Sequence, residues 1–221
     1  MSQVLTNPEA AFDAATRWEG LGGGHAARHC ALAALVEIGH YSEAAQGLEK
    51  LAQEVRADAG FKVQILVQSA RAWIAAGDAP HAAAVTDAAL ELVPNAMAAR
   101  LVRGRARALQ GQFWNAIDDF NEVLSANPAL AEALVMRGAA YRQLDALDLS
   151  LEDLNRGLTL EPDHPEGLLE RGIVYRLQDH KAEARADWRR LIELYPKSEA
   201  ARAARNNLHR LDSGVDNQPV R

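Results

Sequence analysis

His25, His29 and Cys30 are the residues whose types and spacing come closest to a metal site. Two histidines four positions apart share one face of a helix, so both imidazoles could reach one ion. A zinc site needs four ligands, or three and a water molecule. No further ligand is evident nearby, because His40 lies beyond a turn. The sequence therefore favours two surface histidines and a buried thiol, with metal binding as a minor alternative.

Two other patterns resemble functional sites, a phosphate-binding loop and a catalytic pair of acids, but lack features that such sites require. Gly22-Gly23-Gly24 lacks the lysine and the preceding strand of a phosphate-binding loop, so a flexible turn is predicted. Asp118-Asp119 and Glu152-Asp153 are adjacent acids, which point in different directions on a helix. They are predicted to lie on a solvated outer face and are poor candidates for a catalytic pair. No catalytic residue, metal or cofactor is predicted.

These residues belong to a chain that repeats every 34 positions. Four prolines hold the period, and so does an Arg-Gly pair. They are Pro94, Pro128, Pro162 and Pro196, with Arg103-Gly104, Arg137-Gly138 and Arg171-Gly172. A fixed period of this length is typical of a solenoid, in which each unit buries its apolar face against its neighbours.

Each unit contains two helical patterns joined by a short turn. In 97–130 the first helix is predicted over about 97–109, and Gln110-Gly111-Gln112 ends it. The second has the i, i+3, i+4, i+7 spacing of one buried stripe, and Pro128 prevents its continuation. That stripe consists of Ala116, Ile117, Phe120, Val123 and Leu124. Phe113 and Trp114 begin this helix, where core packing is predicted and a partner contact is the alternative.

The predicted organisation follows from counting back from the prolines. An N-terminal arm and half-repeat helix occupy 1–24, and a solenoid of five repeats occupies 25–198. The repeats are 25–58, 63–96, 97–130, 131–164 and 165–198. A capping helix over 199–212 shields the open end of the solenoid, with Ala200, Ala204, Leu208 and Leu211 facing the last repeat, and a disordered tail occupies 213–221.

The repeats resemble the tetratricopeptide repeat (TPR), which has glycine and an aromatic residue in its first helix and alanine, a large apolar residue and proline in its second. One repeat matches at Gly104, Ala116, Phe120 and Pro128; the last matches at Gly172, Tyr175, Ala184, Trp188 and Pro196. Arg107 departs from the pattern, because an aromatic residue usually packs there. The resemblance covers 25–198 and implies an all-α fold, an α-α solenoid forming a right-handed superhelix with capping helices. It also implies no catalytic activity, and peptide binding in a concave groove lined by first helices.

Charge sorts by helix. The first helices (63–76, 97–110, 131–144, 165–178) total +6, and the second helices (79–92, 113–126, 147–160, 181–194) total −6. A basic groove suited to an acidic and apolar partner segment is therefore predicted. The alternative is that arginines pair locally with Glu132, Glu166 or Glu170. The recurring Arg103, Arg137 and Arg171 are assigned a structural role. The groove set is Gln64, Gln68, Arg71, Leu101, Arg105, Val135, Arg142, Leu169, Ile173 and Arg176.

The net charge, the cysteine count and the lack of long apolar stretches limit the location and the partners that can be expected. The chain has 221 residues and a net charge of −6, which argues against nucleic acid and acidic membranes. Cys30 is the only cysteine, so no intrachain disulfide can form. The N-terminus lacks the features of a secretory signal, and no stretch has the roughly 18 apolar residues that span a bilayer. A cytoplasmic location is predicted.

The sequence therefore predicts a noncatalytic adaptor or scaffold that binds a protein or peptide partner, possibly an acidic one, in its groove. Self-assembly into a homo-oligomeric scaffold is the alternative, and metal binding through His25, His29 and Cys30 the minor one. Some TPR proteins grip chaperone tails with a carboxylate clamp. His29 and Ala33 occupy the corresponding stretch here, so that signature is absent.

Overall fold

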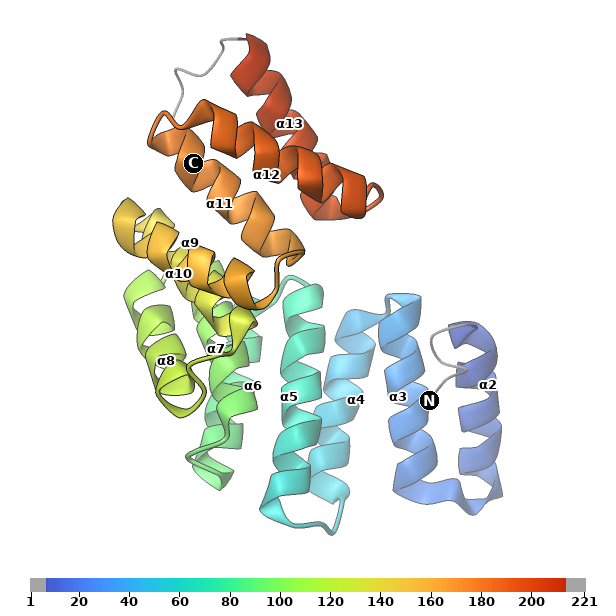
Figure 1. Ribbon diagram of the computed structural model, residues 1–221. Coiled ribbons are helices and arrows are strands. Elements are labelled where there is room, and N and C mark those ends of the chain that lie inside the picture. Colours follow the sequence, from blue (N-terminus) through green and yellow to red (C-terminus); the bar gives the residue numbers. More distant parts are fainter. Residues whose placement is uncertain (1–6, 214–221) are drawn as a thin grey trace. The chain divides into compact units, whose positions relative to one another are not determined.

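The computed structural model describes residues 7–213, and every regular element within that range is a helix (Figure 1). The chain divides into two compact units, Met1–Asp119 and Phe120–Arg221, which are described one at a time. The predicted second helices 79–92, 113–126, 147–160 and 181–194 coincide residue for residue with α6, α8, α10 and α12. The repeat period therefore locates the helices as well as the fold class.

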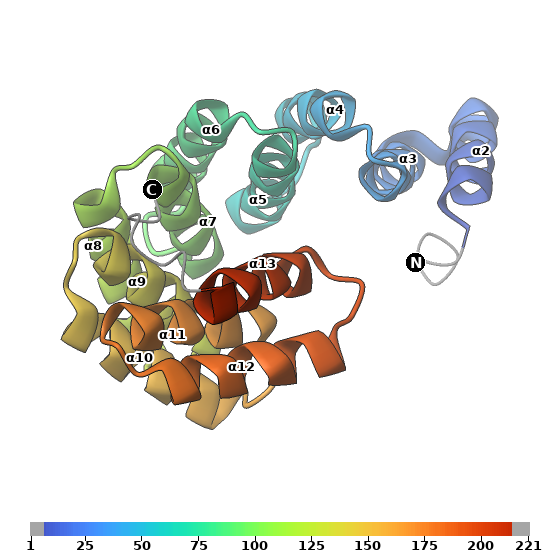
Figure 2. The same ribbon diagram turned by 90° about the horizontal axis from the view of Figure 1, so that it is seen from above.

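The first unit is a series of helices that pack in sequence order (Figure 2). Helix α5 packs against both α4 and α6, and it also touches α7. Alanine, valine and Trp73 from α4 to α7 form one buried cluster, and leucines of α3 and α4 form another with Ile65. The elements are α2 (Pro8–Trp18), the π-helical turn η1 (Glu19–Gly23), α3 (Gly24–Ile38), α4 (Tyr41–Glu54), α5 (Ala59–Ala75), α6 (Ala79–Leu92), α7 (Met97–Leu109) and the start of α8 (Phe113–Ala126).

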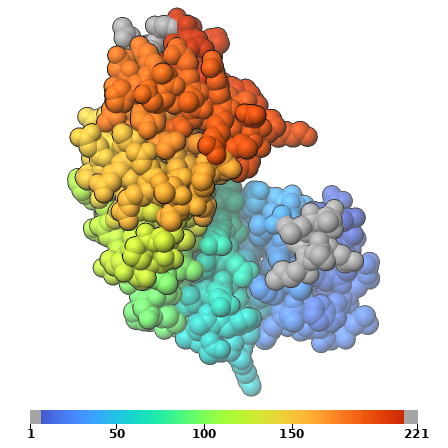
Figure 3. Space-filling model, viewed as in Figure 1, coloured from blue at the N-terminus to red at the C-terminus, as the bar shows by residue number. Residues whose placement is uncertain are grey.

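In the second unit α9 packs against α10, α11 against α12, and α13 against both α11 and α12. Trp188 is fully buried with Leu168 and Leu191 in the cluster that α13 joins through Ala204 and Leu211. On the face that Figure 3 shows, the side chains of α9 to α12 form one continuous surface. The elements are α9 (Ala131–Gln143), α10 (Leu147–Leu160), α11 (Pro165–Leu177), α12 (Lys181–Leu194) and α13 (Glu199–Ser213).

The turn within each repeat requires a left-handed residue at one fixed position. Gly77 and Gly111 take φ values of 83° and 74° there. In the next two repeats the same conformation is held by Asp145 (φ 59°) and Asp179 (φ 63°). Aspartate is one of the few residues other than glycine that tolerates this conformation. The turn therefore repeats in geometry even where the glycine is absent.

The ends of the chain contain parts of the predicted organisation. Gly22 (φ 93°) and Gly24 (φ 55°) form the turn between α2 and α3. Helix α13 covers the range where a capping helix was predicted, and the Ser198 hydroxyl accepts a hydrogen bond from the Ala201 amide at 3.0 Å. The predicted disordered tail lies outside the described residues, except for Ser213, which ends α13. Among the described helices, none has the length and apolar character needed to cross a membrane.

Candidate functional site

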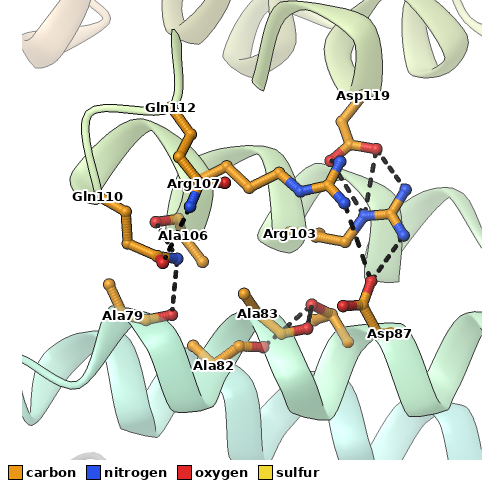
Figure 4. A network of polar contacts seen from close by, with 11 residues as sticks. Ala79, Ala82, Ala83, Asp87, Arg103, Ala106, Arg107, Gln110, Gln112 and Asp119 are labelled. Carbon is orange, nitrogen blue, oxygen red and sulfur yellow. Dashed lines mark hydrogen bonds and ion pairs between the residues drawn. The ribbon is translucent and has the colours of Figure 1, made fainter. Parts of the chain in front are cut away.

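Arg103 of α7 joins the second helices on its two sides (Figure 4). Its Nε and Nη2 donate to Asp119 of α8 at 3.0 and 2.6 Å, and its Nη1 donates to Asp87 of α6 at 2.8 Å. The Asp119 side chain is only 3% exposed and the Arg103 side chain 17%. A bidentate arginine–carboxylate pair with little solvent access fixes both side chains in one geometry.

The same arrangement occurs twice in the second unit. Arg137 binds Asp153 at 2.6 and 2.7 Å and Asn121 at 2.7 Å. Arg171 binds Asp187 at 2.8 and 2.7 Å and Asn155 at 3.0 Å. Each arginine thus contacts the second helix of its own repeat and that of the repeat before. We call Arg103, Arg137 and Arg171 the arginine ladder.

The contacts of the arginine ladder contradict one prediction, and they raise the pKa of the ladder arginines. Asp119 and Asp153 were predicted to be solvated, and they are buried. They are buried because each accepts at least two hydrogen bonds from a ladder arginine, which compensates the cost of removing the carboxylate from water. The hydrogen bonds that Arg103 donates to Asp119 raise the pKa of Arg103 above its ordinary value, although burial opposes the shift. The carboxylates Asp153 and Asp187 likewise raise the pKa of their arginines.

The contacts of Arg107 show what this residue does in place of the aromatic residue that is usual at its position. It stands where Tyr141 and Tyr175 stand in the next two repeats. Those tyrosine rings lie 5.9 and 5.7 Å from the guanidinium carbon of Arg137 and Arg171, whereas Arg107 donates to Asp119 at 2.9 Å. One extra cation is thus placed beside a buried carboxylate.

In the first unit the predicted groove residues differ in exposure. Gln64, Arg71 and Arg105 are exposed on α5 and α7. Gln68 is half-buried, and its Oε1 lies 2.8 Å from Nε2 of His29. Leu101 is buried and contributes to packing.

In the second unit the predicted groove residues are mostly engaged. Val135 and Ile173 are buried, and Leu169 packs against the cluster around Trp188. Arg142 is half-buried and bound to Glu170, with its Nε 2.6 Å from Oε2. This pair is the local neutralisation that the sequence offered as an alternative. Arg176 is half-buried as well.

The pairing changes the meaning of the charge counts. Five first-helix arginines are held by carboxylates, so their charge does not form a free basic surface. They are Arg103, Arg107, Arg137, Arg142 and Arg171. Arg71 and Arg105, one repeat apart, keep their side chains exposed on successive first helices.

The remaining candidate residues are accounted for differently. Among residues 7–213, no group of three or more histidine, cysteine or acidic side chains could hold a metal ion. His25, His29 and Cys30 line an almost wholly apolar cavity of about 380 Å³ instead. Trp114 is 65% exposed, so its predicted core packing is wrong, and a partner contact stays a prediction.

A polar cluster centred on Glu49 of α4 was not predicted from the sequence. Trp73 Nε1 donates to Glu49 Oε1 at 2.6 Å, and His81 Nε2 lies 3.3 Å from the same oxygen. The His81 ring stacks on Trp73 with centroids 4.2 Å apart. Ser69, one repeat before Arg103, lies 3.5 Å from Oε1 as well. The sequence did contain a signal for this cluster. Serine stands at position 69, where the 34-residue period would place a ladder arginine, so the arginine ladder is interrupted in this repeat.

Comparisons with known proteins agree with the repeat geometry. Profiles of the tetratricopeptide repeat match residues 131–164 and 166–198. Among curated protein sequences, none matches the chain closely enough to count as a relative.

Solved structures with similar folds include TPR proteins. A thermophilic TPR protein of Thermus thermophilus, TTC0263, has 21% identity and a TM-score of 0.69, over 87% of this chain and 99% of that one. MamA from Desulfovibrio magneticus RS-1 has 24% identity and a TM-score of 0.60, over 75% and 91%. The first TPR of Spaghetti (RPAP3), bound to the HSP90 peptide SRMEEVD, has 23% identity and a TM-score of 0.50, over 54% and 92%. At these identities the similarity shows the fold.

Proposed function

Because the chain is a tetratricopeptide-repeat protein, we propose that it is a noncatalytic scaffold that binds a segment of a partner protein along its first helices. TPR folds support protein interaction in general, and the RPAP3 neighbour carries a bound peptide. The partner of this chain has to be inferred from the side chains that its own first helices expose.

The observation that carries the proposal is the exposure of Arg71 and Arg105. Most other arginines of the first helices are tied to carboxylates, but these two occupy the same position on α5 and α7 and are exposed. Gln64 of α5 is exposed on the same helix as Arg71. Two guanidinium groups on one face favour a segment with two acidic residues, since arginine binds carboxylates in a bidentate manner.

In the second unit the same position is held by Ala139 and Ile173. Ala139 of α9 is half-buried, whereas Ile173 of α11 is buried in the cluster around Trp188, so the second unit exposes no arginine at this position. A partner segment whose acidic residues bind α5 and α7 and whose apolar residues pack against the small Ala139 of α9 fits the two kinds of surface, each unit binding its own part.

A selection from a random-peptide library tests the proposal with the whole chain as bait. We expect peptides enriched in Asp and Glu together with Leu, Ile or Phe. The double variant Arg71→Glu, Arg105→Glu should bind the selected peptides at least about tenfold more weakly, through like-charge repulsion. Arg189→Glu, an exposed site on α12, is the matched control and should bind normally.

Circular dichroism and light scattering on the same samples separate binding from unfolding and from self-assembly. The proposal is wrong if no acidic motif is enriched, or if the double variant binds as well as the control.

A further inference from the structure

The arginine ladder shows what normally lies between neighbouring second helices of this chain. We call each junction between two neighbouring second helices a step. At three successive steps a guanidinium group fills that position and binds an acid or amide on either side. The step between α4 and α6 is different. Ser69 of α5 stands one repeat before Arg103, and its short side chain donates to the Ala45 carbonyl at 3.0 Å. Among the described residues, no arginine bonds to Glu49 at that step.

The acceptor for a guanidinium is nevertheless present. Glu49 of α4 holds the place that Asp87 of α6 holds beside Arg103. Along the chain, Glu49 precedes Ser69 by one helical turn more than Asp87 precedes Arg103. The difference arises because α5 is one turn longer than α7. On the other side Val85 stands one repeat before Asp119, so that wall is apolar.

The Glu49 carboxylate is only partly satisfied. The hydrogen bonds from Trp73 and Ser69 go to Oε1, which is also 3.3 Å from His81 Nε2, and within residues 7–213 no hydrogen bond reaches Oε2. The side chain is 25% exposed. An accessible carboxylate oxygen is thus fixed in place by a tryptophan indole.

A groove of about 450 Å³ opens at this position, between α4, α5 and α6, and we call it the Glu49 groove. Its apolar walls include Leu66, Val85 and Ala88. Its charged groups are Glu49 and Glu91 against Lys62, with His81 at the Glu49 side, so the lining carries a net negative charge when His81 is neutral. The walls suit an aliphatic stem and the carboxylate suits a cationic head.

We propose that the Glu49 groove binds an arginine side chain of a partner protein. The incoming guanidinium donates to Glu49 Oε2, and its methylene stem packs against Leu66, Val85 and Ala88. The partner thereby supplies between α4 and α6 the group that Arg103, Arg137 and Arg171 supply between the later helices. Arginine fits better than lysine because its planar head is less strongly hydrated and its stem covers apolar surface. This surface is separate from the first-helix surface of the proposed function.

The indole N–H of Trp73 is a built-in reporter, since it donates to the same carboxylate. The test titrates the full-length chain with the acetylated and amidated tripeptide Leu-Arg-Ala and records the indole signals by ¹H–¹⁵N NMR. The Trp73 signal is assigned with Trp73→Phe. We expect this signal to shift and saturate, with a Kd on the order of millimolar for a single side chain. The same peptide with citrulline, a neutral analogue of arginine, should not shift it.

Two variants separate the site from non-specific attraction. Glu49→Gln keeps an acceptor for Trp73 and should weaken binding at least about tenfold. Glu91→Gln removes an exposed charge at the rim and should change binding less than about twofold. Equal binding of the citrulline peptide, or unchanged binding by Glu49→Gln, overturns the proposal, as does the absence of any saturable shift.

Rebuilding the ladder gives an independent arm. Ser69→Arg combined with Val85→Asp places a guanidinium group and its second carboxylate inside the chain, and it should abolish peptide binding. If that double variant unfolds by circular dichroism, the Glu49→Gln result decides alone. A folded double variant that still binds the arginine peptide contradicts the proposed position.

Discussion

Replacing Asp153 by asparagine should destabilise the second unit far more than the same replacement at an exposed ion pair. Asp153 accepts hydrogen bonds from Arg137 Nε and Nη2 at 2.6 and 2.7 Å, and its side chain is 4% exposed. Asparagine keeps the shape but removes the charge, and its amide group must face one of the arginine donors. The half-buried guanidinium loses one hydrogen bond and its counter-charge.

The magnitude follows from burial and from what remains. Removing one partner of a buried ion pair costs about 3–5 kcal/mol. Arg137 is 17% exposed and still donates to Asn121 at 2.7 Å, so water and an amide compensate part of the loss. We expect a net loss of about 2–3 kcal/mol. The control is Asp163→Asn, whose pair with Arg190 is 51% exposed on both sides and is expected to contribute about 0–1 kcal/mol.

Urea unfolding combined with hydrogen exchange of the α9 and α10 amides measures the effect, because repeat proteins need not unfold as one unit. A double-mutant cycle with Arg137→Met isolates the pair, and the double variant should be more stable than the sum of the single losses predicts. Either of two results would contradict this expectation: Asp153→Asn costs no more than Asp163→Asn, or the losses from the two ladder substitutions are additive.

Two further predictions concern packing and pH. Gly172→Ala should destabilise by about 1–3 kcal/mol in thermal unfolding, because an added Cβ lies 2.7 Å from Trp188 Cδ1. Gly20→Ala, with no atom within 4 Å of the added Cβ, is the control and should cost less than half as much. Hydrogen bonding to Asp187 raises the pKa of Arg171, so its stabilising contribution is complete below the ordinary pKa of arginine and is lost only as the pH rises through the raised pKa. Stability measured from pH 7 to about 11 should therefore show no loss from this pair. In Arg171→Lys it should decline as the pH passes the lysine pKa, about 10.4 in model peptides.

The period made the helices predictable because it fixes both the breaks and the buried stripes. Proline cannot continue a helix, and Ala116, Ile117 and Phe120 must face one side, so α8 follows with little ambiguity. The left-handed turns at Asp145 and Asp179 were less visible, since aspartate is common in many settings.

The contacts of the ladder could not be predicted in the same way. Asp119 follows Asp118, and such a pair looks like a solvated face when only one helix is considered. Whether Asp119 is buried depends on a donor from the preceding helix, Arg103 of α7. The sequence does carry the signal, because Asp119, Asp153 and Asp187 keep the same period as the arginines. Recognising it requires comparing positions across repeats for charge as well as for shape.

Trp114 was misplaced for a related reason. A large aromatic residue at the start of a helix is commonly part of a core, and its neighbour Phe113 is half-buried. The turn after Gly111 sets the direction of the first residues of α8, and it leaves the Trp114 ring 65% exposed. Helix phase near an end depends on the turn, which the apolar pattern alone does not determine.

Charge balance within each step links the ladder to the Glu49 groove. Between α6 and α8 two cations, Arg103 and Arg107, meet two anions, Asp87 and Asp119.

At the ladder positions of the later steps one arginine meets one aspartate, because asparagine and tyrosine replace the extra aspartate and arginine. The sequence varies there without leaving a buried charge unmatched, as the cost of an unpaired charge requires.

Between α4 and α6 that balance is absent: Glu49 remains, while Ser69 and Val85 supply neither a cation nor a second acid. Its 25% exposure and the hydrogen bond from Trp73 make the unmatched carboxylate tolerable. An incoming guanidinium would restore the balance found at every later step, which is the physical reason to expect affinity at this position.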